Sequence, residues 1–292
     1  DPFVDGRMQG KLNLGNLADL IPLGEETLLA GILDTDVSIK GRYSAIEESR
    51  YEDFKANGNL ALADFRYQSP ELEPLLIPEA ELALSPQQAN LQTFRFESGQ
   101  SDLQASGRLT NLLGYAMKGK TLQGNFTVRS DYFNLNPLLA SEEGDAKPAE
   151  KPEQPQPDTG SGYALEAPQI PANLNLTLKA DPLRQLVYTN MDMRNIRGQI
   201  QVRDQALYLD DFRMDMLDGT MTASGRYSTQ DPEQPQTAME LSIRDFSMQA
   251  ANRTFTMLRQ YAPVAKHTYG DFDADLSFNA PIQPNLTPVY DS

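Results

Sequence analysis

One stretch of the chain has the residue spacing of a phosphate-binding loop. Gly114 to Thr121 reads Gly-Tyr-Ala-Met-Lys-Gly-Lys-Thr, which is a glycine, four residues and then Gly-Lys-Thr. Such a loop binds nucleotide phosphates only when a helix follows it, because backbone amides and the helix N-terminus surround the phosphates. Here Leu122, Phe126 and Val128 follow at the even spacing of a strand. We therefore expect a hairpin loop that binds neither ATP nor GTP.

Three aspartates near the C-terminus have the spacing that opens a calcium-binding loop. They are Asp271, Asp273 and Asp275. That loop also requires glycine at its sixth position and glutamate at its twelfth. The chain has Leu276 and Ile282 at those positions. Because the aspartates alternate with apolar residues, we expect them to form the solvated face of a strand.

Other chemically active residue types are scarce. His267 is the only histidine, so a histidine-based triad or metal cluster could draw on it alone. We expect it to be a solvated residue beside the end of a helix. Asp210 and Asp211 fit a turn between Leu209 and Phe212 and need no acid–base role. The absence of cysteine excludes disulfides, thiol nucleophiles and cysteine-ligated zinc. We predict a protein that is not an enzyme, with no catalytic residues, no metal site and no cofactor.

The charge balance restricts the possible partners. The 292 residues include 41 acidic and 25 basic ones, a net charge of −16. Nucleic acids and anionic membrane surfaces both attract basic proteins, so this balance disfavours direct binding to either. No apolar run approaches the roughly 18 residues of a membrane-spanning helix.

Most of the chain consists of segments in which apolar and polar residues alternate, the spacing of a strand with one apolar face. One unit occurs twice: the sequences at 94–96 and 105–108 return at 212–214 and 223–226, each 118 positions later (212 − 94 = 118). Both copies contain Ala-Ser-Gly-Arg. We predict a mainly β protein with an elongated, curved antiparallel sheet or sheets of repeated β-meander units, apolar on one face.

Two segments have helical signals. Between Met248 and Tyr261 the apolar residues follow the three-to-four spacing of a helix, which predicts a helix there. A capping-box pattern that begins at Ser44 predicts a short surface helix extending towards Phe54.

One segment has the composition of a linker. Residues 141–162 are rich in Pro, Glu and Gln and nearly free of apolar residues. Such a segment cannot offset the entropy cost of folding, so we expect a flexible linker or loop. It separates a first β-repeat region, 1–140, from a second, 163–292, which we expect to be truncated at the C-terminus.

A sheet with one apolar face must cover that face, and the expected helices are few. The sheet therefore curls over its own face or leaves an open groove. Acyl chains are a natural filling for an apolar groove. The alternative is a packed β-sandwich core that serves as a scaffold for envelope proteins. The candidate lipid-binding residues of a groove are apolar residues of the alternating segments: Leu60, Leu62, Leu82, Leu84, Phe94, Phe96, Leu174, Leu176, Leu178, Ile200, Val202, Leu241 and Ile243.

Several of these features together carry a resemblance to a known family. They are the one-faced strands, the Ser-Gly-Arg and Gln-Gly glycines, the phrases at 133–139 and 255–263, and the Pro/Glu-rich interruption. The chain resembles the C-terminal region of AsmA family members from double-membraned bacteria. The resemblance implies a periplasmic protein of outer-membrane assembly, anchored in the inner membrane by an N-terminal helix outside this sequence. It also implies a long β-sheet groove like that of chorein-type bridge-like lipid carriers.

The resulting hypothesis is a non-enzymatic periplasmic protein that binds phospholipid acyl chains in an apolar β-sheet groove. The alternative hypothesis is a β-sandwich scaffold or adaptor that binds envelope proteins.

Overall fold

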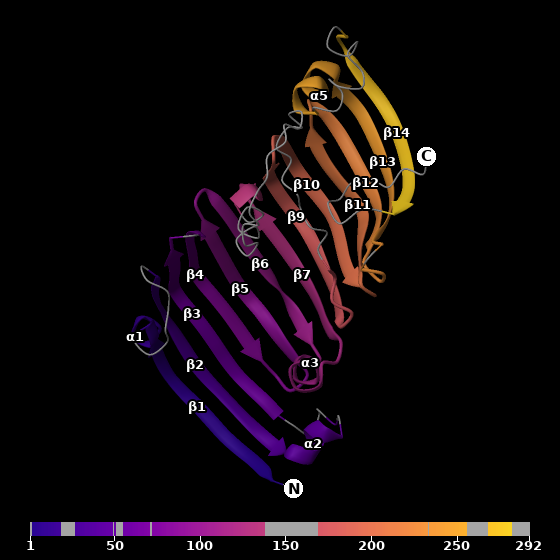
Figure 1. Cartoon of the computed structure of the whole chain (residues 1–292). Coiled ribbons are helices and arrows are strands. Elements are labelled where there is room, and N and C mark those ends of the chain that lie inside the picture. Colours follow the sequence, from indigo (N-terminus) through magenta and orange to yellow (C-terminus); the bar gives the residue numbers. More distant parts are fainter. Residues whose placement is uncertain are drawn as a thin grey trace, which may run out of the picture.

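The computed structural model contains one long curved sheet of 14 strands whose two edges do not meet (Figure 1). The structure describes residues 2–18, 27–48, 50, 55–70, 72–137, 169–232, 234–255 and 268–281. The predicted mainly β, elongated and curved architecture is confirmed. The predicted linker, 141–162, lies outside the described residues, and so does His267.

The strands run along the chain in the following order. In the first half they are β1 (Phe3–Asn13), β2 (Leu28–Arg42), β3 (Lys55–Ser69), β4 (Leu72–Leu84), β5 (Gln88–Ser98), β6 (Ser101–Thr110), β7 (Leu122–Ser130) and β8 (Phe133–Asn134). In the second half they are β9 (Leu174–Tyr188), β10 (Met191–Arg203), β11 (Ala206–Met216), β12 (Gly219–Ser228), β13 (Gln236–Ser247) and β14 (Asp271–Pro281).

Each strand pairs with its neighbours in chain order, and only the middle of the sheet departs from an antiparallel meander. There β7 pairs with β9 in parallel, and the short β8 also pairs with β9 in parallel. The sheet is therefore mixed, which corrects the prediction of an antiparallel sheet. Parallel neighbours require a crossover connection, whereas antiparallel ones need only a turn. The chain between β8 and β9 is long enough for such a crossover.

The curvature has a local cause in a series of β-bulges. The pairing register shifts within β2–β3, β4–β5, β10–β11, β11–β12 and β13–β14. Asp64, Asn195, Asp211 and Asp245 have left-handed φ angles of 51°, 51°, 45° and 56° at or beside these shifts. Asp and Asn tolerate this conformation better than most residues. A bulge bends its strand and increases the local twist, so a row of bulges curves the sheet.

The two copies of the sequence repeat form matching hairpins. β5 and β6 pair with a register shift between Leu91 and Phe94, and β11 and β12 pair with the same shift between Leu209 and Phe212. The predicted duplication of a β-meander unit is therefore confirmed. Asp210 and Asp211 lie in this bulge within β11, so the predicted turn between two strands is wrong there.

Short helices lie where the chain passes between strands. They are α1 (Gly15–Ala18), α2 (Tyr43–Glu47), α3 (Leu112–Lys118) and α5 (Met248–Thr254). α2 and α5 fall where helices were predicted, and residues 51–54 of the first predicted helix lie outside the described ranges. α5 ends before Phe255, which has an extended backbone, and residues 256–261 lie outside the described ranges. α3 was not predicted, because the sequence indicated a loop at that position. Within the described ranges, no helix has both the length and the apolar composition needed to cross a membrane.

Candidate functional site

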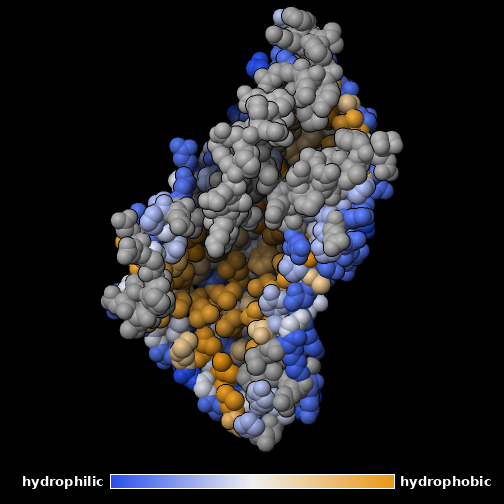
Figure 2. Space-filling view, in the orientation of Figure 1, coloured by the Kyte–Doolittle hydropathy of each residue, from blue (hydrophilic) through white to orange (hydrophobic). Residues whose placement is uncertain are grey.

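The two faces of the sheet differ in chemistry. Side chains directly opposite each other on neighbouring strands lie on the same face, so the pairing assigns each residue to a face. Leu60 pairs with Leu82, and Leu178 pairs with both Phe126 and Ile200. We call the face that carries these residues the groove face and the opposite one the outer face. Figure 2 shows apolar side chains gathered in a hollow over the first half of the sheet.

The groove face is apolar along one complete row of paired residues from β1 to β14. The row contains three glycines, of which two belong to the sequence repeat, and one threonine. All of its other residues are apolar. In strand order it consists of Gly10, Thr35, Leu60, Leu82, Leu91, Gly107, Phe126, Leu178, Ile200, Leu209, Gly225, Met239 and Phe278. No charged side chain interrupts this row.

All of the candidate groove residues lie on the groove face. The candidates outside the central row are assigned to the same face by pairs such as Leu176 with Val202 and Leu62 with Ala80. Each of the candidates is half-buried within the protein. A side chain in this state still has apolar surface that an occupant of the groove can cover. The positions are Leu60, Leu62, Leu82, Leu84, Phe94, Phe96, Leu174, Leu176, Leu178, Ile200, Val202, Leu241 and Ile243.

The repeated glycines accommodate large side chains from the next strand. Gly107 pairs with Phe126, and a Cβ at Gly107 would lie 2.5 Å from Phe126 Cδ1 and overlap the carbonyl oxygen of Asn125. Gly225 pairs with Met239 in the second copy, and a Cβ there would lie 2.5 Å from Met239 Sδ. Glycine within a strand often marks such a close approach. The repeated Ala-Ser-Gly-Arg sequence therefore has a packing role in both copies.

One end of the groove face is filled by its own side chains. Ile196, Met214, Met216 and Phe246 are almost completely buried and form one cluster. The rings of Phe246 and Phe272 meet edge to face, with centroids 6.0 Å apart. This arrangement adds to the stabilisation from burial.

α5 lies beside this cluster and spans the ends of several strands. It begins directly after β13, and the carbonyl of Thr254 at its end accepts a hydrogen bond from Asn190 in the β9–β10 turn at 2.9 Å. The hydroxyl of Ser247 caps its start by accepting from the amide of Ala250. The groove face therefore has a packed core near α5 and half-buried apolar side chains, such as Leu60 and Leu178, elsewhere.

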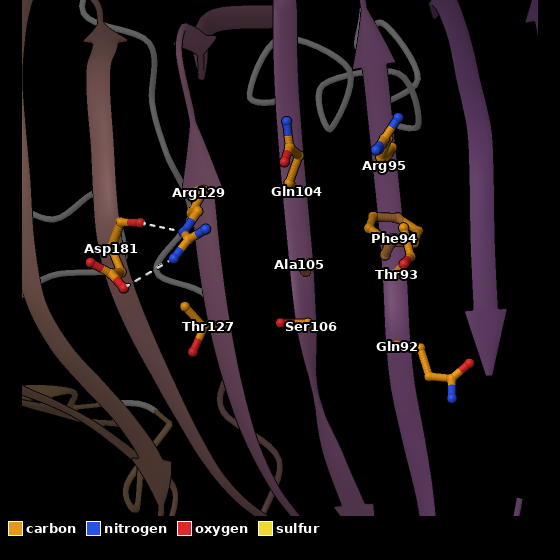
Figure 3. Close-up of a pocket in the computed structure, with 10 residues that line it drawn as sticks. All are labelled: Gln92, Thr93, Phe94, Arg95, Gln104, Ala105, Ser106, Thr127, Arg129 and Asp181. Carbon is orange, nitrogen blue, oxygen red and sulfur yellow. Dashed lines mark hydrogen bonds and ion pairs between the residues drawn. The ribbon is translucent and has the colours of Figure 1, made fainter. Parts of the chain in front are cut away.

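The outer face is polar and carries ion pairs. Arg129 Nε donates a hydrogen bond to the Asp181 carbonyl at 2.8 Å, and Arg129 Nη2 lies 3.5 Å from the Asp181 carboxylate. Both residues line a hollow of about 400 Å³ (Figure 3). On β1 and β2, Arg7 donates two hydrogen bonds of 3.0 Å to Asp36. These bonds lower the pKa of the Asp36 carboxyl. Both side chains are exposed, so the pair contributes little to stability.

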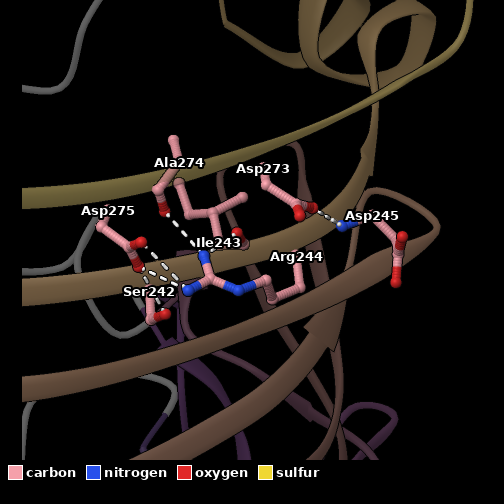
Figure 4. Close-up of polar contacts among 7 residues, drawn as sticks. All are labelled: Ser242, Ile243, Arg244, Asp245, Asp273, Ala274 and Asp275. Atoms are coloured by element: carbon pink, nitrogen blue, oxygen red, sulfur yellow. Dashed lines mark hydrogen bonds and ion pairs between the residues drawn. The ribbon is translucent and has the colours of Figure 1, made fainter.

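The aspartates of β14 lie on the outer face, as predicted, and hold neighbouring strands together (Figure 4). Arg244 Nη2 donates to both carboxylate oxygens of Asp275, at 2.8 and 3.0 Å, and the Ser242 hydroxyl donates to Asp275 at 2.7 Å. Asp273 accepts from the backbone amide of Asp245, the bulge residue of β13, at 2.9 Å. Among the described residues, no group of three or more acidic or histidine side chains is placed to hold a metal ion.

The Asp275 contacts predict a measurable pH effect. Hydrogen bonds from Ser242 and then Arg244 lower the pKa of Asp275 below its ordinary value of 3.8. The stabilisation from this group is therefore present above that value and is lost as the pH falls through the lower, folded-state pKa. We expect Arg244→Gln to raise the pKa of Asp275, measured by NMR titration of the carboxyl carbon. Arg7→Gln, at the far edge of the sheet, is the control and should leave that pKa unchanged.

A polar group on the groove face has no hydrogen-bond partner. The hydroxyl of Tyr227, on β12, is shielded from solvent and unpaired within the described structure. Burial raises the pKa of this hydroxyl. A raised pKa keeps this hydroxyl protonated at neutral pH.

The phosphate-loop pattern at 114–121 has a different backbone from a working phosphate site. Most of it lies in α3, and Gly119 ends that helix with a left-handed φ of 60°. The amide of Gly119 donates to the Tyr115 carbonyl at 2.9 Å, and the amide of Lys120 donates to the Gly114 carbonyl at 3.0 Å. These amides are engaged within the chain and are not available to phosphate oxygens. The hairpin-loop prediction was wrong, because a helix occupies the position.

Comparison of the chain with protein-family models, with curated proteins and with solved structures returned no match. The residues and their arrangement are therefore the basis for a functional assignment.

Proposed function

We propose that this protein binds phospholipid acyl chains on the groove face of its sheet and has no enzymatic activity. The observation that carries the proposal is the uncharged row of paired residues that crosses the whole sheet, on a face where all of the candidate side chains are half-buried. A buried acyl chain gains about 0.8 kcal/mol per methylene. Partial covering of a long chain therefore offsets a substantial cost of immobilisation.

The shape of the sheet supports a lipid ligand over a β-sandwich. The described strands form one sheet, and no second sheet covers the groove face. A scaffold would fill its apolar face with its own side chains, as the cluster around Ile196 does near α5. Around Leu60 and Leu178, by contrast, the side chains remain partly accessible. A scaffold function is therefore favoured only for the part of the groove face near α5, which the chain's own side chains fill.

The cellular setting is part of the same proposal. The resemblance to the AsmA family supports a periplasmic location, an inner-membrane anchor outside this sequence and a role in outer-membrane assembly. Envelope proteins are possible partners in that setting. The acidic balance, a net charge of −16, favours a ligand held by apolar contact over nucleic acid.

Lipid extraction and mass spectrometry test the proposal. The purified chain is expected to carry phospholipid or to take it up from labelled liposomes. Leu176→Glu and Ile200→Glu each place a carboxylate on the groove face, where burial without a partner is costly. We expect each variant to lower the retained lipid by about tenfold or more, the effect of roughly 1.4 kcal/mol.

The matched control is Gln201→Glu, which puts the same carboxylate on the outer face, one residue from Ile200. It should leave lipid retention unchanged. A folded wild-type chain that neither carries lipid nor takes any from liposomes would favour the scaffold. A folded Leu176→Glu variant with unchanged lipid would remove β9 from the binding path.

A further inference from the structure

A cavity of about 470 Å³ lies where the groove face meets α3. Val37, Ile39, Ala56 and Leu84 line it from β2, β3 and β4, and Leu112 and Leu113 line it from α3. Its volume is within the range of small-molecule sites in proteins.

The cavity is continuous with the groove face. Ile39 pairs with Ala56, and Gly58 pairs with both Val37 and Leu84, which places these side chains on one face. Leu84 follows Leu82 of the central row by two positions along β4. An extended apolar chain that lies on Leu82 therefore reaches the cavity by continuing along the strand towards α3.

Among the residues that the structure describes, none of those lining the cavity is charged. Two of its polar side chains are already engaged, since Asn111 Nδ2 donates to the Thr121 carbonyl at 2.7 Å and the Ser85 hydroxyl donates to the Gln88 carbonyl at 3.1 Å. A phosphate in this position would lose its water without gaining a cationic partner. The hollow on the outer face, by contrast, is lined by Arg95, Arg129 and Asp181.

We propose that the cavity beneath α3 receives the methyl end of the acyl chain, so that bound phospholipids lie with their tails towards α3 and their head groups away from it. This inference rests on the proposed lipid-binding function. It adds a direction to the bound lipid and a site at which chain length is sensed.

Photolabelling of the unmodified protein tests the direction. Two phospholipids are compared, one with a diazirine at the methyl end of its acyl chain and one with a diazirine beside the ester. After irradiation, the methyl-end label should be found by mass spectrometry on Leu84 and on the peptide that contains Leu112 and Leu113. The ester-side label should fall on other peptides. Methyl-end labelling that avoids α3, or equal labelling of α3 by both probes, would overturn the inference.

A substitution tests the sensing of chain length. Leu113→Trp partly fills the cavity, and excluding about two methylenes should lower the retained ratio of long-chain to short-chain phospholipid about tenfold. Ala116→Trp adds the same ring to an exposed position of α3 and is the control. An unchanged ratio in a folded Leu113→Trp variant would overturn the inference while leaving the groove intact. If the wild-type chain binds no phospholipid at all, both this inference and the proposed function fail.

Discussion

Ile196→Ala is expected to lower the free energy of unfolding by about 2–5 kcal/mol. The Ile196 side chain has 0% exposure and lies at the centre of the cluster with Met214, Met216 and Phe246. Its truncation removes buried apolar surface and leaves a cavity that the strands cannot close fully. The measurement is the shift in the urea midpoint, followed by circular dichroism.

Ile32→Ala makes the same chemical change at a position that is 45% exposed. We expect this control to cost about 1 kcal/mol or less, since exposed positions lose little burial on truncation. Equal midpoints for the two variants would contradict the assignment of the packed core to the α5 end of the sheet.

Gly107→Val is expected to destabilise the protein by about 3 kcal/mol, at the upper end of the usual cost of overpacking. The new Cβ overlaps the Asn125 carbonyl oxygen and crowds Phe126, and the nearest atoms include the backbone of β7. Relief requires β6 and β7 to move apart, which weakens their pairing. Urea unfolding again provides the measurement.

Gly10 provides the matched control, because it belongs to the same row of the groove face but has nothing within 4 Å of its Cβ position. Gly10→Val should be neutral or slightly stabilising, since valine favours strands by up to about 1 kcal/mol. We therefore expect the free energy of unfolding to fall by about 3 kcal/mol in Gly107→Val and to stay the same or rise slightly in Gly10→Val. A similar loss of stability in both would show that glycine is needed for a reason other than close packing.

Residue periodicity was sufficient to predict which face of most strands is apolar. Leu174, Leu176 and Leu178 alternate without interruption and lie together on the groove face. Leu91 and Leu209 also lie on that face, but their distance from Phe94 and Phe212 is an odd number of residues. Strict alternation would place them on the opposite face. The bulge in each copy adds one residue and restores them to the groove.

Other features depend on contacts that are distant in sequence. The parallel pairing of β7 with β9 is set by the path of a long connection, which local spacing does not encode. α3 has only seven residues, too few for a clear helical period, and residues with left-handed φ angles, Asn111 and Gly119, flank it. The α3 cavity was missed for the same reason, since it forms only when α3 lies beside the ends of β2 and β4.

The parallel junction has a consequence for the symmetry of the molecule. From β5 to β11 there are five neighbour-to-neighbour steps in the order β5-β6-β7-β9-β10-β11, and one of them is parallel. The four antiparallel steps reverse the strand direction an even number of times, so β5 and β11 point the same way. With a wholly antiparallel order the second copy would be inverted. The duplicated units are instead related by translation and rotation along the sheet, and each keeps the same end towards the same side. A molecule that moved from one unit to the next would therefore meet the same surface in the same orientation, without having to turn over.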